Sequence, residues 1–228
     1  MKLLPLLLLL FTACQRPNYT QISSPFQVDY KINRFEKTIL GYEKQDSLQM
    51  PEKGGIVLAG SSSFFFWKTV QQDLAPLPII NRGFGGSTLS EVVHYLNRTV
   101  IKYQPKTVVV YCENDLYGTK PKTPEQMRDA YVNLCQELRK SLPKTAIYFV
   151  SLKPSPLRWK QWGDASQVNS LIQEFIKTDK RHYYVDITAV MLKNGKPDGS
   201  IFLSDSLHMN AEGYRRWTNV LKPILSEK

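Results

Sequence analysis

The fold is decided by the stretch Ile56-Val57-Leu58-Ala59-Gly60-Ser61-Ser62-Ser63, in which a short apolar run meets a glycine and three serines. The run is aliphatic and nearly continuous, which is typical of a strand buried on both faces of a parallel sheet. Four later runs have the same character and are predicted strands: 77–81, 107–112, 146–152 and 183–187.

Segments with apolar residues at helical spacing surround these runs. The predicted helices cover residues 30–50, 63–74, 88–103, 124–142, 164–178 and 210–225. Because strands alternate with helices, the sequence predicts a three-layer α/β/α sandwich with right-handed crossovers around a central parallel sheet of about five strands. Neither an internal repeat nor a second apolar core is evident, so we expect a single domain that covers residues 30–228.

The composition is that of a globular protein with a sizeable core. Hydrophobic residues make up 42% of the 228 residues, which excludes a disordered or low-complexity chain. The formal net charge of +10 first suggests nucleic acid as a partner. However, the Lys and Arg residues are spread over the chain without a nucleic-acid-binding motif, so we expect no nucleic-acid partner. The charge suits a protein held beside an anionic membrane or cell wall.

The N-terminus has the pattern of an export signal. Lys2 is followed by an apolar run and then by small residues, which predicts a secretory signal peptide over residues 1–13. The apolar run 3–11 would span about 14 Å as a helix, half of a bilayer core of roughly 30 Å, so we expect no transmembrane anchor.

The end of this segment, Phe11-Thr12-Ala13-Cys14, resembles a bacterial lipobox. The resemblance implies that Cys14 is lipidated and becomes the mature N-terminus. The protein is then an exported, membrane-anchored lipoprotein of the cell envelope, on the periplasmic side or at the cell surface, and residues 14–29 form a polar tether. The alternative is an ordinary signal peptide with a chance cysteine.

The functional site of such a sheet lies beyond the carboxyl ends of its strands. After the first strand, the serines of Gly60-Ser61-Ser62-Ser63 could cap a helix or supply a nucleophile at its N-terminus, and this turn taken alone favours the cap. After the second strand, the glycines of 81–88 allow close backbone approach without forming a dinucleotide or phosphate-binding motif. They could donate a backbone N–H to an oxyanion or make a tight turn.

Two further segments carry chemistry. Asn114 follows the third strand, where its side chain could stabilise negative charge as a neutral donor or serve as a turn residue. Near the C-terminus, His208 follows Asp205 by three positions, which is the pairing of an imidazole base with a carboxylate. His94 and His182 are interpreted as structural.

Together these four segments resemble the GDSL or SGNH hydrolase superfamily, and the resemblance covers nearly all of residues 56–220. It implies a flavodoxin-like fold and a Ser-His-Asp triad. Ser61 stands where the family has Asp, as in a subgroup whose first block reads Gly-Ser-Ser-Ser and ends in Trp, here Trp67. The roles implied are a catalytic triad of Ser62, Asp205 and His208, and an oxyanion hole of Ser62, Gly86 and Asn114.

The resemblance implies a serine esterase or acylhydrolase that cleaves short acyl groups, above all acetyl groups, from a carbohydrate or similar small ester. The alternative is a catalytically impaired binding lipoprotein on the same fold, because Cys112 stands where the third block has glycine. Residues 153–159 also resemble the subgroup and are expected to form a wall of the pocket, although the sequence assigns them no role.

No metal or cofactor is implied, because the sequence holds neither His-Glu-x-x-His nor Cys-x-x-Cys. Cys112 and Cys135 could pair in an oxidising compartment, but two buried thiols are the favoured interpretation. The sequence leaves the oligomeric state open.

Overall fold

The computed structural model describes residues 33–227, so the predicted signal peptide, Cys14 and the whole tether lie outside the described residues. Its centre is a parallel five-stranded sheet with the order β2-β1-β3-β4-β5. The strands are β1 (Ile56–Gly60), β2 (Ile79–Asn81), β3 (Thr107–Tyr111), β4 (Ala146–Val150) and β5 (His182–Val185). The predicted α/β fold with about five parallel strands is confirmed.

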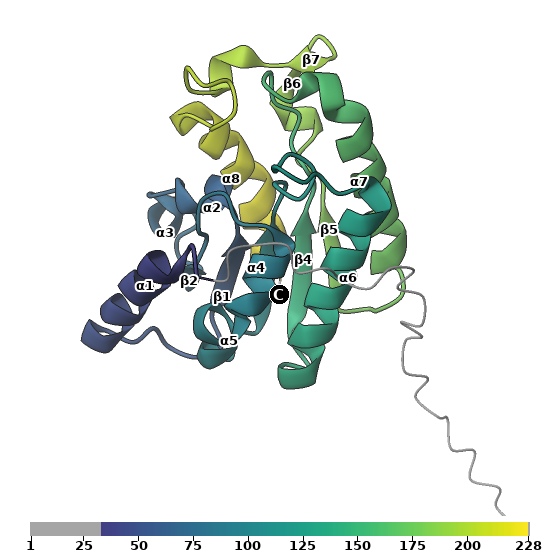
Figure 1. Cartoon of the computed structure of the whole chain (residues 1–228). Helices are drawn as coiled ribbons and strands as arrows, with labels where there is room; N and C mark the ends of the chain where they lie inside the picture. The colour runs from purple at the N-terminus through teal and green to yellow at the C-terminus, as the bar shows by residue number, and fades with distance from the viewer. Residues whose placement is uncertain (1–32, 228) are drawn as a thin grey trace, which may run out of the picture.

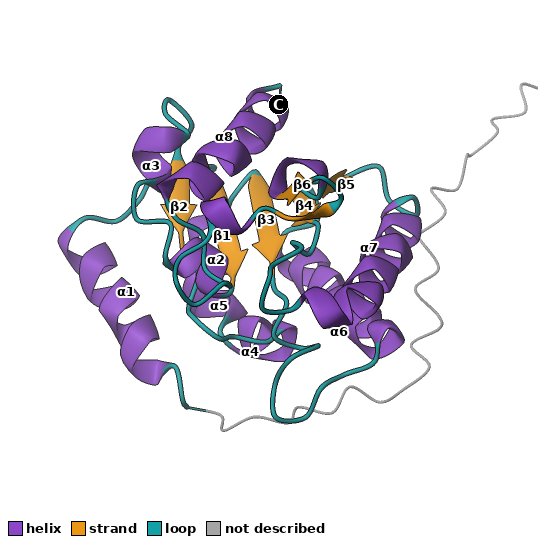
Figure 2. Ribbon diagram, turned by 90° about the horizontal axis from the view of Figure 1, so that it is seen from above, coloured by secondary structure: helices purple, strands orange, loops and turns teal. Residues whose placement is uncertain are grey.

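Helices cover both faces of this sheet (Figure 2). One layer holds α3 (Val70–Asp73) and α8 (Ala211–Ser226), and the short α2 (Ser62–Phe65) packs into the same core through Phe64. The other layer holds α4 (Leu89–His94), α5 (Leu96–Thr99), α6 (Pro124–Ser141) and α7 (Trp162–Ile176). The first described helix, α1 (Glu36–Leu48), lies beyond the β2 side of the sheet, as Figure 1 shows.

The strand sequences explain why the sheet is covered on both faces. Along β3, Val108 and Val110 enter the core under α4 and α6, whereas Val109 and Tyr111 enter the core under α8. Every β3 residue is buried, as expected for a central parallel strand. Full burial of each such side chain contributes roughly 1.5–3 kcal/mol, so β1, β3 and β4 fix the centre of the domain.

Two predicted helices are broken by buried aromatic residues. The segment 63–74 divides into α2 and α3 because Trp67 turns inward between them, stacks on Tyr214 at 5.2 Å and donates from Nε1 to Asp73 at 2.6 Å. The segment 88–103 divides at the buried Tyr95, whose ring packs edge-on against Phe84 with centroids 5.8 Å apart, into α4, α5 and a 3-10 turn (Ile101–Tyr103). At both breaks, aromatic burial outweighs the few helical hydrogen bonds that are lost.

The structure also settles several smaller features outside the central sheet and its helices. A hairpin of β6 (Leu192–Lys193) and β7 (Lys196–Pro197) was not predicted. His182, which is interpreted as structural, begins β5, and burial lowers its pKa to about 4. Cys112 and Cys135 are buried free thiols, so the favoured interpretation is confirmed. Among residues 33–227, no helix has both the length and the apolar character needed to cross a bilayer.

Candidate active site

The turn after β1 places Ser62 at the beginning of α2. Gly60 has φ +141°, and a Cβ on it would lie 1.8 Å from the carbonyl oxygen of Tyr111. The next residue, Ser61, donates its backbone N–H to that same oxygen at 3.0 Å. Ser61 occupies the N-cap position of α2, as the cap interpretation predicts, but its side chain makes no capping hydrogen bond. The backbone builds the turn, and Ser62 is its first helical residue.

Four of the five predicted site residues line one open cavity of about 400 Å³, and the fifth, Asp205, does not line it. Ser62, Gly86, Asn114 and His208 all line it, although they come from four separate segments of the chain. Its other lining residues are mostly apolar or aromatic: Phe35, Thr38, Phe65, Phe66, Gly85 and Leu207. The carboxyl ends of β1, β2 and β3 therefore converge as the parallel topology predicts.

His208 is paired with Asp205 at the edge of this cavity. Nδ1 of His208 lies 2.6 Å from Oδ2 of Asp205. Oδ1 of Asp205 accepts the backbone N–H groups of Leu207 and His208, each at 2.9 Å. Partial burial raises the pKa of Asp205, but the hydrogen bonds from the His208 side chain and from these backbone groups outweigh it and lower the pKa to about 2. The carboxylate is thus ionised and orients the imidazole through Nδ1.

The loop after β2 is anchored to α2 by Asn81. The Asn81 Nδ2 donates to the carbonyl oxygen of Phe64 at 2.7 Å, and its Oδ1 accepts the backbone N–H of Gly83 at 3.0 Å. A Cβ on Gly83 would lie 2.7 Å from that of Phe64, so a larger residue does not fit. We call residues 83–86 the glycine loop. Its last residue, Gly86, adopts φ +81° at the cavity.

Asn114 is held at the cavity by both ends of its amide group. Its Nδ2 donates to the carbonyl oxygen of Ser87 at 3.1 Å, and its Oδ1 accepts from Nη2 of Arg158 at 3.2 Å. The NH₂ group has two hydrogens, so one is left for a ligand. Cys112 does not displace Asn114: its buried thiol donates to the same Ser87 carbonyl at 2.9 Å.

A buried ion cluster stands behind the site. Nζ of Lys153, with no exposed side-chain surface, lies 2.6 Å from Oε1 of Glu113, which Arg158 also contacts at 3.0 Å. The same Nζ donates to Oγ of Ser63 and to the hydroxyl of Tyr111, each at 3.2 Å. Burial raises the pKa of Glu113, but the two cations outweigh it and hold that pKa below its usual range.

The expected pocket wall of residues 153–159 is therefore a support instead. None of these residues is among those that line the described cavity. Lys153 braces the turn after β1, and Arg158 braces Asn114. No sequence motif marks Glu113, Phe35 or Thr38 as residues of the site, because the residues that they meet there are distant in sequence.

No metal centre is found in the part of the chain that the structure describes. Within residues 33–227, no three His, Cys, Asp or Glu side chains are grouped closely enough to hold a metal ion. The site residues provide a hydroxyl, an imidazole paired with a carboxylate, and neutral amide donors, which are the groups that acyl transfer uses.

Comparison with known proteins agrees with this geometry. The model of the GDSL-like lipase/acylhydrolase family matches residues 54–216. No curated protein matches the chain at a significant level.

Solved structures share the fold at low sequence identity. A GDSL-like lipase from Bacteroides thetaiotaomicron is 17% identical with a TM-score of 0.69, over 86% of this chain and 99% of that one. The lipase/acylhydrolase from Enterococcus faecalis is 18% identical with a TM-score of 0.64, over 76% and 96%. A carbohydrate esterase of family 3 from Talaromyces cellulolyticus is 12% identical with a TM-score of 0.62, over 76% and 97%.

These structures establish the fold, and the family match establishes the class of enzyme. Because that match spans more than half of the chain, the protein belongs to the GDSL-like lipase/acylhydrolase family and is a carboxylic ester hydrolase.

Proposed function

We propose that the protein is a serine esterase in which Ser62 is the nucleophile and His208 and Asp205 complete the triad. His208 takes the proton of the Ser62 hydroxyl, and the oxygen attacks the carbonyl carbon of an ester. His208 then returns the proton to the leaving alcohol, and water releases the acyl group by the same path. Asp205 remains ionised and stabilises the imidazolium that forms in each step.

The oxyanion is bound by the backbone N–H groups of Ser62 and Gly86 and by the Asn114 amide. Support comes from the common cavity that these three residues line and from the fixed orientation of the Asn114 amide. Donors that are held in place before reaction lose no free energy to reorganisation as the charge develops.

A short acyl group on a carbohydrate is the substrate that we propose. The cavity is small and open, and Phe35, Phe65 and Phe66 offer faces and edges on which a sugar ring or short acyl chain can pack. The shared fold of a carbohydrate esterase adds weight to this choice.

We further propose that the enzyme works at the cell envelope, tethered by lipid on Cys14. The support is the sequence of residues 1–14 alone. We expect the wild-type chain to sediment with membranes after expression in bacteria, and Cys14→Ser to be released. Equal membrane association of the two proteins would contradict a lipid on Cys14.

The observation that carries the proposal is that Ser62 and His208 line one cavity while His208 is paired with Asp205 through Nδ1. A fluorophosphonate probe tests it, because only an activated serine reacts with such a probe. We expect labelling that is lost in Ser62→Ala and retained in Ser61→Ala. Ser61 is a matched control because its buried Oγ has no hydrogen-bond partner among the described residues. Absence of labelling in folded wild-type protein would favour a binding protein.

Asn114→Ala is expected to lower kcat by about 10²–10³-fold, because one oxyanion donor is removed. The KM should change little, since the ground-state carbonyl uses this donor less than the transition state does. Steady-state kinetics on an aryl acetate measure both. Asn97→Ala, at an exposed position on α5, serves as the control. A kcat within twofold or so of wild type in Asn114→Ala would exclude the amide as an oxyanion donor.

A further inference from the structure

The helix that precedes the family match forms one wall of the cavity. The match begins at residue 54, but Phe35 and Thr38, before that point, line the cavity. We propose that the segment 34–42 completes the active site: Arg34 positions the glycine loop, and Phe35 with Thr38 walls the acyl subsite. This inference rests on the proposed esterase function.

Arg34 is anchored by a buried carboxylate while it binds the glycine loop. Its guanidinium pairs with Glu91 in a bidentate manner, with Nη2 2.6 Å from Oε2 and Nε in contact with Oε1. The Glu91 side chain is 1% exposed and also accepts the backbone N–H of Thr88 at 2.9 Å. From this anchor, Nη2 of Arg34 donates to the carbonyl oxygen of Gly86 at 2.9 Å. The planar fork of arginine serves both partners, which a lysine ammonium reproduces poorly.

The hydrogen bond from Arg34 to Gly86 matters because a glycine without such a contact has little restriction on its backbone conformation. Gly86 adopts φ +81°, and a glycine samples many other conformations at little cost. A backbone donor must lie about 2.7–3.1 Å from the oxyanion to stabilise it. A misplacement of about 1 Å costs about 10²-fold in rate. Arg34 therefore acts on the rate through Gly86, as a positioning residue.

The same segment holds the other end of the glycine loop. The hydroxyl of Tyr42 donates to the carbonyl oxygen of Gly83. The ring of Phe35 packs edge-on against Phe84, with centroids 4.9 Å apart. The helix α1 is itself held to α5 by Arg98, which pairs with two of its glutamates. Residues that precede the family match therefore contact the glycine loop at its first, second and last positions.

The placement of Phe35 and Thr38 assigns them to the acyl part of the substrate. The leaving alcohol lies beside His208, because it receives its proton from that imidazole. The ring of Phe66 packs against His208 with centroids 4.7 Å apart, which puts Phe66 on the leaving-group side. Phe35 packs instead on Phe84 of the glycine loop, and Thr38 lies one turn along α1. These two residues therefore face the acyl chain.

The first test measures kcat and KM of Arg34→Gln on an aryl acetate. We expect kcat to fall about 10–10²-fold with little change in KM, because a donor is misplaced while the substrate site remains. Arg34→Lys should recover only part of the rate. Arg215→Gln is the matched control: Arg215 makes a bidentate pair with Glu212 on α8, at 2.6 and 2.7 Å, away from the cavity lining. A wild-type kcat in Arg34→Gln would overturn the role of Arg34.

The second test compares aryl acetate, butyrate and octanoate. Thr38→Trp should lower the butyrate-to-acetate ratio of kcat/KM, and Phe35→Ala should raise the octanoate-to-acetate ratio, each by about 10-fold or more. Circular dichroism confirms that each variant is folded, and a folded variant with a wild-type ratio would overturn the acyl wall. Failure of the wild type to turn over these esters or to be labelled at Ser62 would overturn the proposed function, and this inference with it. Normal turnover and labelling with unchanged variants would overturn this inference alone.

Discussion

Ser62→Ala is expected to lower the kcat for aryl acetate hydrolysis by about 10⁶-fold, the size of effect found when the nucleophile of a serine hydrolase is removed. Without the hydroxyl, His208 has no proton to accept and no acyl-enzyme forms. The substrate can still occupy the cavity and its oxyanion donors, so a residual rate of about 10³–10⁴ over water is expected. Steady-state kinetics at matched protein concentrations of wild type and variant measure the loss.

The fold of Ser62→Ala should be unchanged, which makes the kinetic result easy to interpret. The turn depends on Gly60 and on the backbone bond from Ser61 to Tyr111, neither of which involves the Ser62 hydroxyl. Ser61→Ala is again the matched control and should keep a kcat near that of wild type. A Ser62→Ala enzyme that hydrolyses the ester at full rate would exclude Ser62 as the nucleophile.

The elements that the sequence predicts well are those set by neighbouring residues. The runs of valine and isoleucine predict β1 and β3 to within a residue at each end, because alternate side chains of one short segment supply both cores. Helix α6 begins at Pro124 as predicted, after a capping box formed by Thr123 and Gln126. Local chemistry decides these boundaries, and local chemistry can be read from the chain.

The residues that hold the site residues in place could not be predicted from the sequence. The site residues themselves lie in sequence segments that can be recognised, and the parallel topology predicts that these segments meet at the cavity, as they do for Ser62, Gly86, Asn114 and His208. Arg34, in contrast, finds Glu91 across 57 positions. The partners Lys153 and Ser63 lie 90 positions apart. Contacts of this kind form only when distant segments fold together, so neither hydrophobic periodicity nor motif spacing in the sequence predicts them.

The second large effect is expected on stability, at the buried carboxylate behind the site. Glu113→Gln should lower the free energy of unfolding by about 3–5 kcal/mol, because it leaves the buried cation of Lys153 without its counter-charge. The Lys153 side chain is 0% exposed and that of Glu113 is 2% exposed, so water cannot replace the lost carboxylate. Urea unfolding monitored by tryptophan fluorescence measures the loss as a shift of the midpoint at constant slope.

The effect should also depend on pH, in a direction that follows from the pKa of Glu113. Burial raises this pKa, but Lys153 and Arg158 outweigh burial and hold it below its usual range. A carboxyl group with a lowered pKa stabilises the folded state above its unfolded pKa and loses that contribution as the pH falls through its folded pKa. The difference between wild type and Glu113→Gln should therefore be full at neutral pH and shrink below about pH 4.

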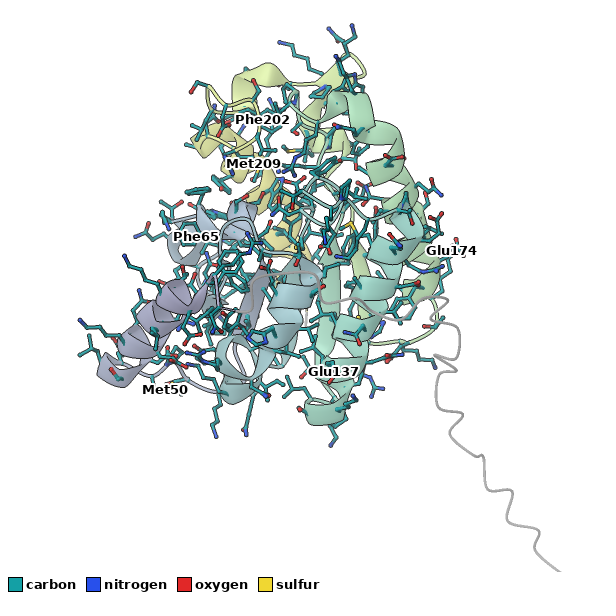
Figure 3. All side chains as sticks on the ribbon, in the orientation of Figure 1. Met50, Phe65, Glu137, Glu174, Phe202 and Met209 are labelled. Carbon is teal, nitrogen blue, oxygen red and sulfur yellow. The ribbon has the colours of Figure 1, made fainter. Side chains whose placement is uncertain are left out.

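Glu174→Gln is the matched control for this prediction. Glu174 and Lys177 also pair at 2.6 Å, but their side chains are 71% and 66% exposed. Glu174 lies on the outer side of α7, across the molecule from Phe65 at the cavity (Figure 3). An exposed ion pair contributes about 0–1 kcal/mol to stability. Although the two ion pairs have the same N–O distance, Glu174→Gln should therefore lower the free energy of unfolding much less than Glu113→Gln. Equal losses in Glu113→Gln and Glu174→Gln would contradict the prediction, because burial would then not strengthen the Glu113 ion pair. The Lys153 ammonium would in that case be stabilised by Ser63 and Tyr111 alone.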